Sequence, residues 1–343
     1  FAQHSTIYHR VLLSDLLWMI SLYGRVGREI PAFLKNSATR SLRFIAALMD
    51  HQTGRVPLYG ANDGSNVLPI AEADYLDFRP IVHAGWKLLE LGDSSLEEGL
   101  WSEMSQWLCC RSNQQVQARL NRLERRLHFT DGGVVLWNNQ DTRLTMRCPS
   151  TFRHRPAQAD LLHVDIVWRH QPIAIDAGTY SYNSSGVFAG GLKQAAVHNT
   201  VTIDAQEPIH MVSRFLYLPW PRGAVEWDNL GGSYSATHNG WQKIGVRHVR
   251  RISKAGDGEF IVSDKFSGCT KRRARLHWLL QDWPYRFDPE GKQLELLTDA
   301  GPFLVRWDLG VANLVRADAA SCRGWWSPCY HQAVPALSLT VEW

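Results

Sequence analysis

The sequence predicts an α+β protein in which an all-helical first part is followed by a large antiparallel β-sandwich. Apolar residues recur at three- and four-residue steps from Ser5 to about Trp107, which is the period of an amphipathic helix. After about Leu127 the pattern changes to many short alternating runs separated by turn residues. Because no helical segment lies between these runs, they are typical of antiparallel sheets.

Three helices are predicted in the first part, each with an identifiable start. Ser5 and Thr6 can cap the first helix with their hydroxyl groups. Pro31 suits the first turn of the second helix, and Pro80 lies near the start of a third helix that follows Asp77. The apolar face of the second helix consists of Leu34, Ala38, Leu42, Ile45 and Met49. A structured loop between the second and third helices is marked by Gly60, Asn62, Asp63 and Gly64.

The second part is predicted to consist of short strands. The clearest runs are GGVVLWN, RLTMRC, LLHVDIVW, PIAIDAG, NTVTID, VRHVRRIS, EFIVSDKF, ARLHWLL, QLELLTD, FLVRWDL and ALSLTVEW. The AGDG segment at residues 255–258 predicts a hairpin turn. Residues 109–128 are mostly polar, so we place the boundary there and expect domains at residues 1–118 and 119–343.

Composition is that of an ordinary globular protein. The chain has 343 residues, of which 45% are hydrophobic and 20% charged, enough to bury a substantial core. It contains no apolar stretch long enough for a membrane span and no N-terminal signal segment. Phe1 lies inside sequence that already has a structured pattern, so we expect a piece of a longer protein. The six cysteines form no CxxC pattern and are expected to be mostly reduced.

The net charge of +4 indicates anionic partners only weakly. The basic clusters lack a nucleic-acid-binding motif, and such runs are commonly solvated faces, so we expect no nucleic-acid partner. An acidic polysaccharide is compatible with this charge. The basic clusters are Arg122, Arg125 and Arg126; Arg247, Arg250 and Arg251; and Lys271, Arg272 and Arg273.

Polar residues that could take part in binding or catalysis are concentrated between Asp160 and Asp204. This stretch reads as a strand hairpin and a return strand, so alternate side chains can converge on one face of a sheet. The residues concerned are His163, Asp165, Asp176, Tyr180, Tyr182, His198 and Asn199.

Several blocks resemble the heparinase II/III-like polysaccharide lyase superfamily. They are STIYHR, GANDGSNVLP, DYLDFRP, RPAQADLLHVDIVW, AIDAGTYSYN, GLKQAAVHNTVTIDAQEP, RFLYLPW and GWWSPCY, and they cover nearly the whole chain in family order. The resemblance implies an incomplete (α/α) toroid followed by antiparallel β-sheets, with further toroid helices upstream of Phe1. It also implies β-elimination on a uronate-containing glycan bound between the two parts.

The resemblance implies catalytic roles near the N-terminus. Tyr8, in the STxYH block, would transfer the proton, since a cationic environment can lower the reference pKa of about 10 of a tyrosine. The alternative for Tyr8 is packing at a helix start. His9 would be a neighbouring site residue with a supporting or structural role.

At the family H-x-H motif this chain departs from the pattern. The position of the catalytic histidine is Pro156, which cannot transfer a proton, and that of the metal-binding histidine is Gln158. His154 could replace the missing catalytic histidine or be an ordinary loop residue. Arg153 and Arg155 could bind uronate carboxylates through their planar guanidinium groups or simply be solvated.

A zinc or other divalent ion in the β-domain is implied by Asp176 and His198. Gln158 is the third family position but a poor zinc ligand, and His163 could supply the missing nitrogen. The alternative is a former metal site, in which Asp176 caps the turn into Gly178 and His198 orders the return strand.

Tyr59, Asn62, Asp63 and Tyr180 are the expected substrate-binding residues, because loops on a rigid scaffold carry specificity. Some of the 15 tryptophans could line a glycan cleft, but most should pack in the core. The leading interpretation is a lyase acting on an acidic polysaccharide in the bacterial periplasm or cell envelope, with an exopolysaccharide favoured over heparan sulphate or alginate. A catalytically inactive glycan-binding or exopolysaccharide-assembly protein is the alternative, and a hydrolase or epimerase a third. The oligomeric state is not indicated.

Overall fold

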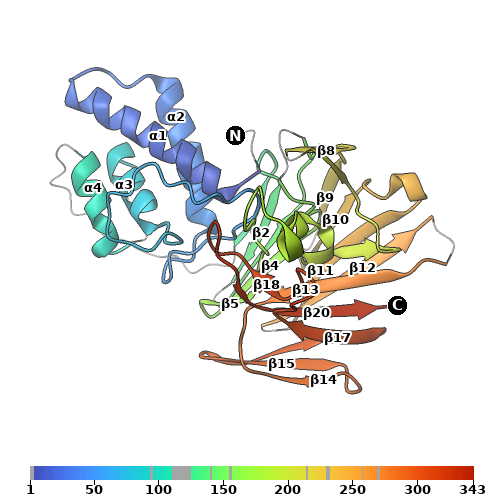
Figure 1. Ribbon diagram of the computed structural model, residues 1–343. Coiled ribbons are helices and arrows are strands. Elements are labelled where there is room, and N and C mark those ends of the chain that lie inside the picture. Colours follow the sequence, from blue (N-terminus) through green and yellow to red (C-terminus); the bar gives the residue numbers. More distant parts are fainter. Residues whose placement is uncertain are drawn as a thin grey trace. The chain divides into compact units, whose positions relative to one another are not determined.

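A computed structural model gives the fold of the chain at residues 4–92, 96–109, 125–139, 141–153, 157–213, 215–228, 232–256, 258–268 and 271–343. The chain divides into two compact units, a helical one and a β-rich one (Figure 1). The helical unit comprises Ser5–Leu58 and Gly64–Leu123, and the β-rich unit comprises Phe1–His4, Tyr59–Asp63 and Glu124–Trp343. The short segment Tyr59–Asp63 thus belongs to the β-rich unit, although its sequence lies within the predicted helical domain.

The helical unit contains the three predicted helices and one more. They are α1 (Thr6–Arg25), α2 (Ala32–Leu48), α3 (Arg79–Leu89) and the short α4 (Glu103–Leu108), which follows the 3-10 turn Leu100–Ser102. Ser5 caps α1 as predicted, because its Oγ accepts a hydrogen bond of 3.1 Å from the Tyr8 amide. Pro31 directly precedes α2, and Pro80 lies in the first turn of α3.

The expected (α/α) toroid is not present in this chain, since the described residues of the helical unit form only these four α-helices. Their packing is close: a Cβ added to Gly85 of α3 would lie 2.9 Å from Leu42 Cδ1 and 3.3 Å from Leu17 Cδ1. Among the described residues, no helix is long and apolar enough to cross a membrane.

A nine-stranded antiparallel sheet forms one layer of the β-rich unit. Its order is β1-β2-β3-β4-β5-β13-β20-β17, and β6 also pairs with β13. The strands are β1 (Arg125–Phe129), β2 (Val134–Asn138), β3 (Thr142–Arg147), β4 (Val164–Trp168), β5 (Gln171–Ala174), β6 (Val201–Ile203), β13 (Ala274–Leu280), β17 (Val311–Arg316) and β20 (Leu337–Glu342).

Smaller antiparallel sheets make up the rest of the unit. One has the order β12-β11-β10-β9, with β9 (Gly223–Trp227), β10 (Ser233–His238), β11 (Arg247–Gly256) and β12 (Glu259–Ser267). Another consists of β14 (Tyr285–Asp288), β15 (Gln293–Thr298) and β16 (Gly301–Arg306). The remaining pairs are β7 (His210–Ser213) with β8 (Leu216–Leu218), and β18 (Trp325–Trp326) with β19 (Val334–Pro335). Strands β11 and β12 form the hairpin that the AGDG segment predicted.

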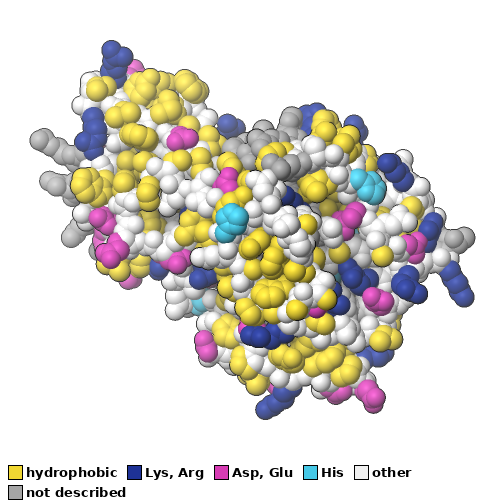
Figure 2. All heavy atoms as spheres, in the orientation of Figure 1, with side chains coloured by type: hydrophobic (Ala, Val, Ile, Leu, Met, Phe, Trp, Pro, Cys, Tyr) yellow, Lys and Arg dark blue, Asp and Glu magenta, His cyan; other side chains and the backbone are white. Residues whose placement is uncertain are grey.

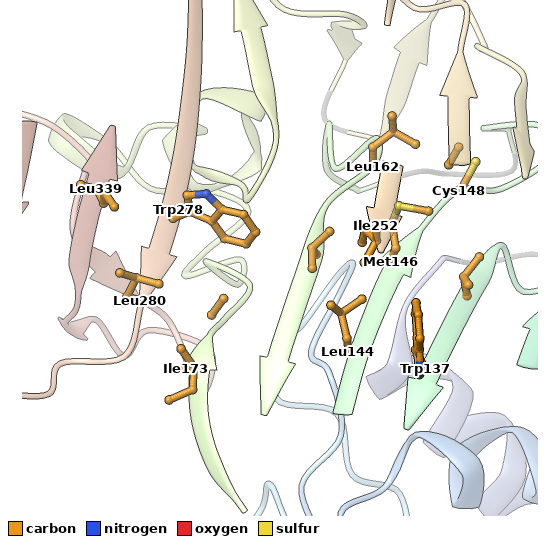
Figure 3. Packing of buried hydrophobic residues seen from close by; sticks show 14 of the residues in the cluster. Trp137, Leu144, Met146, Cys148, Leu162, Ile173, Ile252, Trp278, Leu280 and Leu339 are labelled. Carbon is orange, nitrogen blue, oxygen red and sulfur yellow. The ribbon is translucent and has the colours of Figure 1, made fainter. Parts of the chain in front are cut away.

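One hydrophobic core joins the large sheet to the smaller ones. It contains Trp137 and Leu144 from the large sheet, Ile252 from β11 and Leu294 from β15, all essentially inaccessible to solvent. Figure 3 shows several of these side chains, with Trp137, Leu144, Met146 and Ile252 close to one another. The indole of Trp137 contacts the Phe260 ring edge-on, with centroids 5.3 Å apart. The predicted large antiparallel β-sandwich is therefore confirmed.

A buried ion pair also connects the sheets. Arg250 of β11 donates two hydrogen bonds of 2.9 Å to Asp264 of β12, one from Nε and one from a terminal nitrogen. Its other terminal nitrogen donates to the carbonyl oxygens of Leu162, at 2.8 Å, and Asn199, at 2.6 Å. Burial alone would raise the pKa of Asp264, but the charge of Arg250 and a hydrogen bond from His248 outweigh it and hold that pKa well below its usual value.

Arg250→Met should lower the free energy of unfolding by about 3–5 kcal/mol, because it leaves the Asp264 carboxylate buried without its partner. Guanidinium unfolding of the full chain measures this change. The control is Arg316→Met, which removes the exposed ion pair with Asp282 and should leave the unfolding midpoint unchanged. Equal midpoint shifts for both variants would contradict the role of burial.

Candidate functional site

Three buried side chains of the β-rich unit form a cluster. His163 lies just before β4, Asp176 two residues after β5, and His198 directly after the 3-10 turn Ala195–Val197. Each offers one potential ligand atom, and these atoms lie within 4.8 Å of one another. The sequence predicted their convergence on one face of a hairpin and return strand, and the structure brings the three together.

The pairing of β13 explains why these segments meet. Leu280 of β13 pairs with Ala174 of β5, and Leu276 pairs with Val201 of β6, along the same strand edge. The end of β5 and the start of β6 therefore face one another across a short gap in the sheet. Asp176 follows one side of this gap, and His198 precedes the other.

Asn199 fills the gap with its side chain. Its amide nitrogen donates to the carbonyl oxygens of Val164, at 2.8 Å, and Ile175, at 3.1 Å. Its amide oxygen accepts a 2.6 Å hydrogen bond from the Leu279 amide of β13. One side chain thus supplies hydrogen bonds that a strand backbone would otherwise make.

The backbone of Asn199 fixes the protonation of His163. The Asn199 N–H donates to His163 Nδ1 at 2.9 Å, so in the neutral ring the proton resides on Nε2. Nε2 lies 3.4 Å from Asp165 Oδ2 and 3.8 Å from Asp176 Oδ2. Burial opposes a charge on His163, but the carboxylates of Asp165 and Asp176 outweigh it and raise the pKa of the ring.

Asp176 has one satisfied and one unsatisfied oxygen. Its Oδ1 accepts hydrogen bonds from the Gly178 amide at 2.8 Å and from Gln158 Nε2 at 3.0 Å. Its Oδ2 has no hydrogen-bond partner among the described residues, and the same holds for both ring nitrogens of His198. Burial raises the pKa of Asp176 to about 7, while burial and the charge of His163 lower that of His198 to about 3. His198 is therefore neutral at physiological pH.

The cluster partly fits a metal ion. Zinc binds nitrogen and oxygen at about 2.0–2.2 Å, so two ligands of a tetrahedral ion lie about 3.4 Å apart. Asp176 Oδ2 lies at similar distances, 3.5 Å from His198 Nδ1 and 3.8 Å from His163 Nε2. Asp176 and His198 fit as they stand. His163 fits only if it gives up the hydrogen bond from Asn199, because its Nε2 otherwise carries a proton and has no free lone pair.

Gln158 acts as a bridge in this structure. Its amide oxygen accepts a 2.7 Å hydrogen bond from the Gly60 amide. Its amide nitrogen donates to Asp176 Oδ1 and, at 3.1 Å, to the Gly178 carbonyl. The nitrogen rather than the oxygen therefore faces Asp176, which suits a hydrogen-bonding role better than the expected role of metal ligand.

The Tyr59–Asp63 segment is enclosed within the β-rich unit. Tyr59 is 5% exposed, and the guanidinium of Arg147 lies 4.0 Å from its ring centroid. Asn62 is 2% exposed, and its side chain donates to the Pro328 carbonyl at 3.0 Å. Of the three residues in this segment that were expected to face a substrate, only Asp63 is partly exposed.

Two of the expected catalytic residues, Tyr8 and His9, belong to the helical unit. Tyr8 lies in the first turn of α1 in the helical unit and is partly exposed. His9 is buried there, and its Nε2 lies 3.0 Å from the Ser41 carbonyl and 2.7 Å from the Ser41 hydroxyl, an arrangement that suits a structural role. Arg153 is exposed, and its carbonyl accepts a 2.9 Å hydrogen bond from His4 Nε2. The remaining positions, His154, Arg155 and Pro156, lie outside the described residues.

Tyr180 belongs to an aromatic cluster whose full membership the sequence did not indicate. Its ring centroid lies 4.4 Å from that of Phe188 and 5.9 Å from that of His331. The turn before it requires glycine, since Gly178 has a φ of +81° and an added Cβ would lie 2.2 Å from the Ser327 carbonyl. The cluster, which is mostly half-buried, consists of Tyr180, Tyr182, Phe188, Phe215, Trp325, Tyr330 and His331. The GWWSPCY block was the only signal for its C-terminal members.

Residues 121–342 match the family model described as heparinase II/III-like, C-terminal, and the chain belongs to that family. No curated protein sequence matches the chain.

Several solved structures share the fold. A heparan sulfate lyase, HepC, from Pedobacter heparinus has a TM-score of 0.71 and 15% identity, over 99% of this chain and 50% of that chain. A heparinase III gene product with methylated lysines has a TM-score of 0.73 and 14% identity, over 99% and 49%. A further heparinase III has a TM-score of 0.70 and 13% identity, over 98% and 50%. The chain therefore spans about half the length of these proteins.

Replacement of His9 should change the acid sensitivity of the protein. Burial lowers the pKa of His9 from its usual 6.5 to about 4, so below pH 6.5 the unfolded chain binds a proton that the folded chain does not. The stability contributed by the neutral ring is complete above pH 6.5 and is lost as the pH falls from 6.5 towards 4.

In His9→Gln, the loss of unfolding free energy between pH 7 and pH 5 should be about 2 kcal/mol smaller than in the parent. Urea unfolding of both proteins at the two pH values measures this difference. Replacement of the exposed His210 by Gln is the control and should leave the pH dependence as it is in the parent. An identical pH dependence in His9→Gln and the parent would show that the ring is not held neutral by burial.

Proposed function

We propose that this protein acts as a polysaccharide lyase on an acidic, uronate-containing glycan. The match of residues 121–342 to the heparinase II/III-like family carries the proposal. The solved structures that share the fold include enzymes titled heparan sulfate lyase and heparinase III, which supports the reaction class. The chain spans about half of those enzymes, so the activity belongs to the protein as a whole.

The reaction would be a β-elimination. A base removes the proton at C5 of the uronate, the bond from C4 to the glycosidic oxygen breaks, and a C4–C5 double bond forms. An acid donates a proton to the departing oxygen, so that charge and atoms balance. Because the C5 proton is only weakly acidic, positive groups near the carboxylate must stabilise the enolate-like charge that develops.

Tyr8 is our candidate for proton transfer. Its position in the first turn of α1 holds the backbone rigid, and its side chain is partly exposed. His154 is the candidate partner, and Arg153 and Arg155 are candidates for binding uronate carboxylates through bidentate hydrogen bonds. Asp63 and Tyr180 remain candidates for contact with the glycan. Tyr59 and Asn62 are also candidates, but because they are buried they are better suited to supporting the residues that touch the glycan.

We further propose that the substrate is a bacterial exopolysaccharide, bound by the protein as a whole in a cleft beside the β-sandwich. The sequence shows no dense sulphate-binding basic cluster, which favours an exopolysaccharide over heparan sulphate or alginate. A location in the periplasm or cell envelope would suit this substrate.

A catalytically inactive glycan-binding or exopolysaccharide-assembly protein is the second candidate. The observation that favours it is the loss of the family H-x-H pair, whose positions are Pro156 and Gln158. Gln158 uses its amide in hydrogen bonds to Gly60, Asp176 and Gly178, an arrangement that preserves the fold without requiring catalysis.

Lyase activity should appear as absorbance near 235 nm, a property of unsaturated uronates, when the full-length parent protein is incubated with acidic glycans. Tyr8→Phe should reduce the rate at least 100-fold without loss of glycan binding, because it removes the proton-transferring hydroxyl. Tyr23→Phe, on the same helix, is the matched control and should retain full activity. No absorbance with any of alginate, heparan sulphate and bacterial exopolysaccharides would reject lyase action in favour of the second candidate.

We also propose that Asp176 and His198 bind one zinc ion, with His163 as a third ligand that gives up its hydrogen bond from Asn199 when zinc binds. Bound zinc would neutralise the Asp176 carboxylate and order the turn that follows it. The purified protein should take up one equivalent of zinc in an isothermal titration, and His198→Ala should abolish this uptake. The exposed His210→Ala is the control and should retain it. Gln158→His should bind zinc more tightly than the parent, since it adds an imidazole beside Asp176. No zinc uptake by the parent would contradict the assignment and leave His163 as a proton donor to the two carboxylates.

A further inference from the structure

A separate cavity of about 480 Å³ opens at one end of the four-stranded sheet. His238, the last residue of β10, pairs with Gly223 of β9 on one side and with His248 of β11 on the other. Arg222 precedes β9 and Arg247 begins β11, so the sheet register brings both arginines to the same end of the two strands that flank β10. The cavity shares no lining residue with the His163–Asp176–His198 cluster.

The lining of the cavity carries charge of one sign only. Twelve residues line it, and among them are two arginines but no aspartate or glutamate. Arg222 and Arg247 are both exposed, and no ion pair involves either of them within the described part of the chain. Two guanidinium groups beside a concave surface, without a carboxylate to neutralise them, favour an anionic ligand.

Two glycines, Gly245 and Gly268, are among the residues that line the cavity. Both have left-handed φ angles, +71° and +79°. A Cβ added to Gly268 would lie 2.6 Å from the Gly245 carbonyl oxygen, so the two chain segments can approach each other only because this residue has no side chain. At these two positions no side chain separates a ligand from the backbone.

Amide and imidazole groups on the wall are held in place. Asn239 Oδ1 accepts a 2.7 Å hydrogen bond from the Arg222 amide, and Asn239 Nδ2 lies 3.5 Å from Gln242 Oε1. His238 Nδ1 accepts from the Gly240 amide at 3.0 Å, and its Nε2 lies 3.4 Å from His248 Nδ1. Because His248 bonds to Asp264, the wall is continuous with the buried Arg250–Asp264 pair. These groups are therefore preorganised.

We propose that this cavity is a binding site for an anionic sugar unit, with Arg222 and Arg247 binding its carboxylate or sulfate and the amides of Asn239 and Gln242 its hydroxyl groups. Its volume is within the range of about 300–1,000 Å³ found for small-molecule sites. The anion follows from the cavity alone, whereas the sugar that carries it rests on the proposed function. The site would hold a part of the glycan away from the reacting bond.

Binding by the full chain tests the proposal, measured by calorimetry in the Tyr8→Phe background so that no glycan is consumed. The probes are a non-sulphated tetramannuronate, a heparan sulphate tetrasaccharide and the neutral cellotetraose. Arg222→Gln/Arg247→Gln should weaken binding of an anionic probe at least tenfold, and the probe that loses affinity identifies carboxylate or sulfate as the ligand. Lys265→Gln/Arg306→Gln removes the same charge from exposed positions outside the cavity and should change the Kd less than twofold.

Two further measurements locate the effect. Ala224→Glu adds a carboxylate to an exposed wall position and should also weaken anionic binding, although both arginines remain. A photoreactive glucuronate should label peptides that contain residues 222–224 or 237–247. Unchanged affinity in the arginine variant, equal affinity for cellotetraose, or no label on either peptide would overturn the proposal. The two proposals can fail separately. If the full-length parent produces no absorbance at 235 nm but the arginine variant still loses binding, the lyase function is overturned and the cavity assignment is left intact.

Discussion

The hydrogen bonds of Asn199 are the interaction on which the candidate site depends. Its side chain joins Val164, Ile175 and Leu279, which belong to three different segments, and its backbone joins His163 to Arg250. All four polar atoms of this fully buried residue are therefore used, in five hydrogen bonds. An unpaired buried polar group costs about 1–3 kcal/mol. Few other side chains could therefore fill the gap between β5 and β6 and also make these hydrogen bonds.

The satisfied surroundings of Asn199 contrast with the cluster beside it. Arg250 and Asp264 neutralise each other inside the sandwich, and their hydrogen bonds fix the carbonyl groups of Leu162 and Asn199. The cluster of His163, Asp176 and His198 is equally buried, yet four of its polar atoms have no hydrogen-bond partner among the described residues. A rigid frame around unsatisfied, titratable groups is characteristic of sites where an ion or a proton is exchanged.

Gln158 connects two parts of the β-rich unit. Its amide nitrogen donates to Asp176, and its amide oxygen accepts a hydrogen bond from Gly60 and thereby ties the Tyr59–Asp63 segment to the rest of this unit. Arg147 supports the same segment through its contact with Tyr59 and its ion pair with Asp160.

The sequence by itself determined the class of fold, the three long helices and most strands of the large sheet, because periodicity and capping residues such as Ser5 and Pro80 are local signals. It missed strands such as β9 and β10, because GAVEW and SYSATH each present only two apolar residues to the core, Val225 and Trp227 in β9 and Tyr234 and Ala236 in β10. It also brought together Asp176 and His198 as candidate ligands. Only the tertiary structure decided that Asn199 fixes the His163 proton, that Tyr59 and Asn62 are buried, and that Arg222 and Arg247 meet at one sheet end. These facts depend on strand register and on contacts between distant residues, which no local pattern encodes.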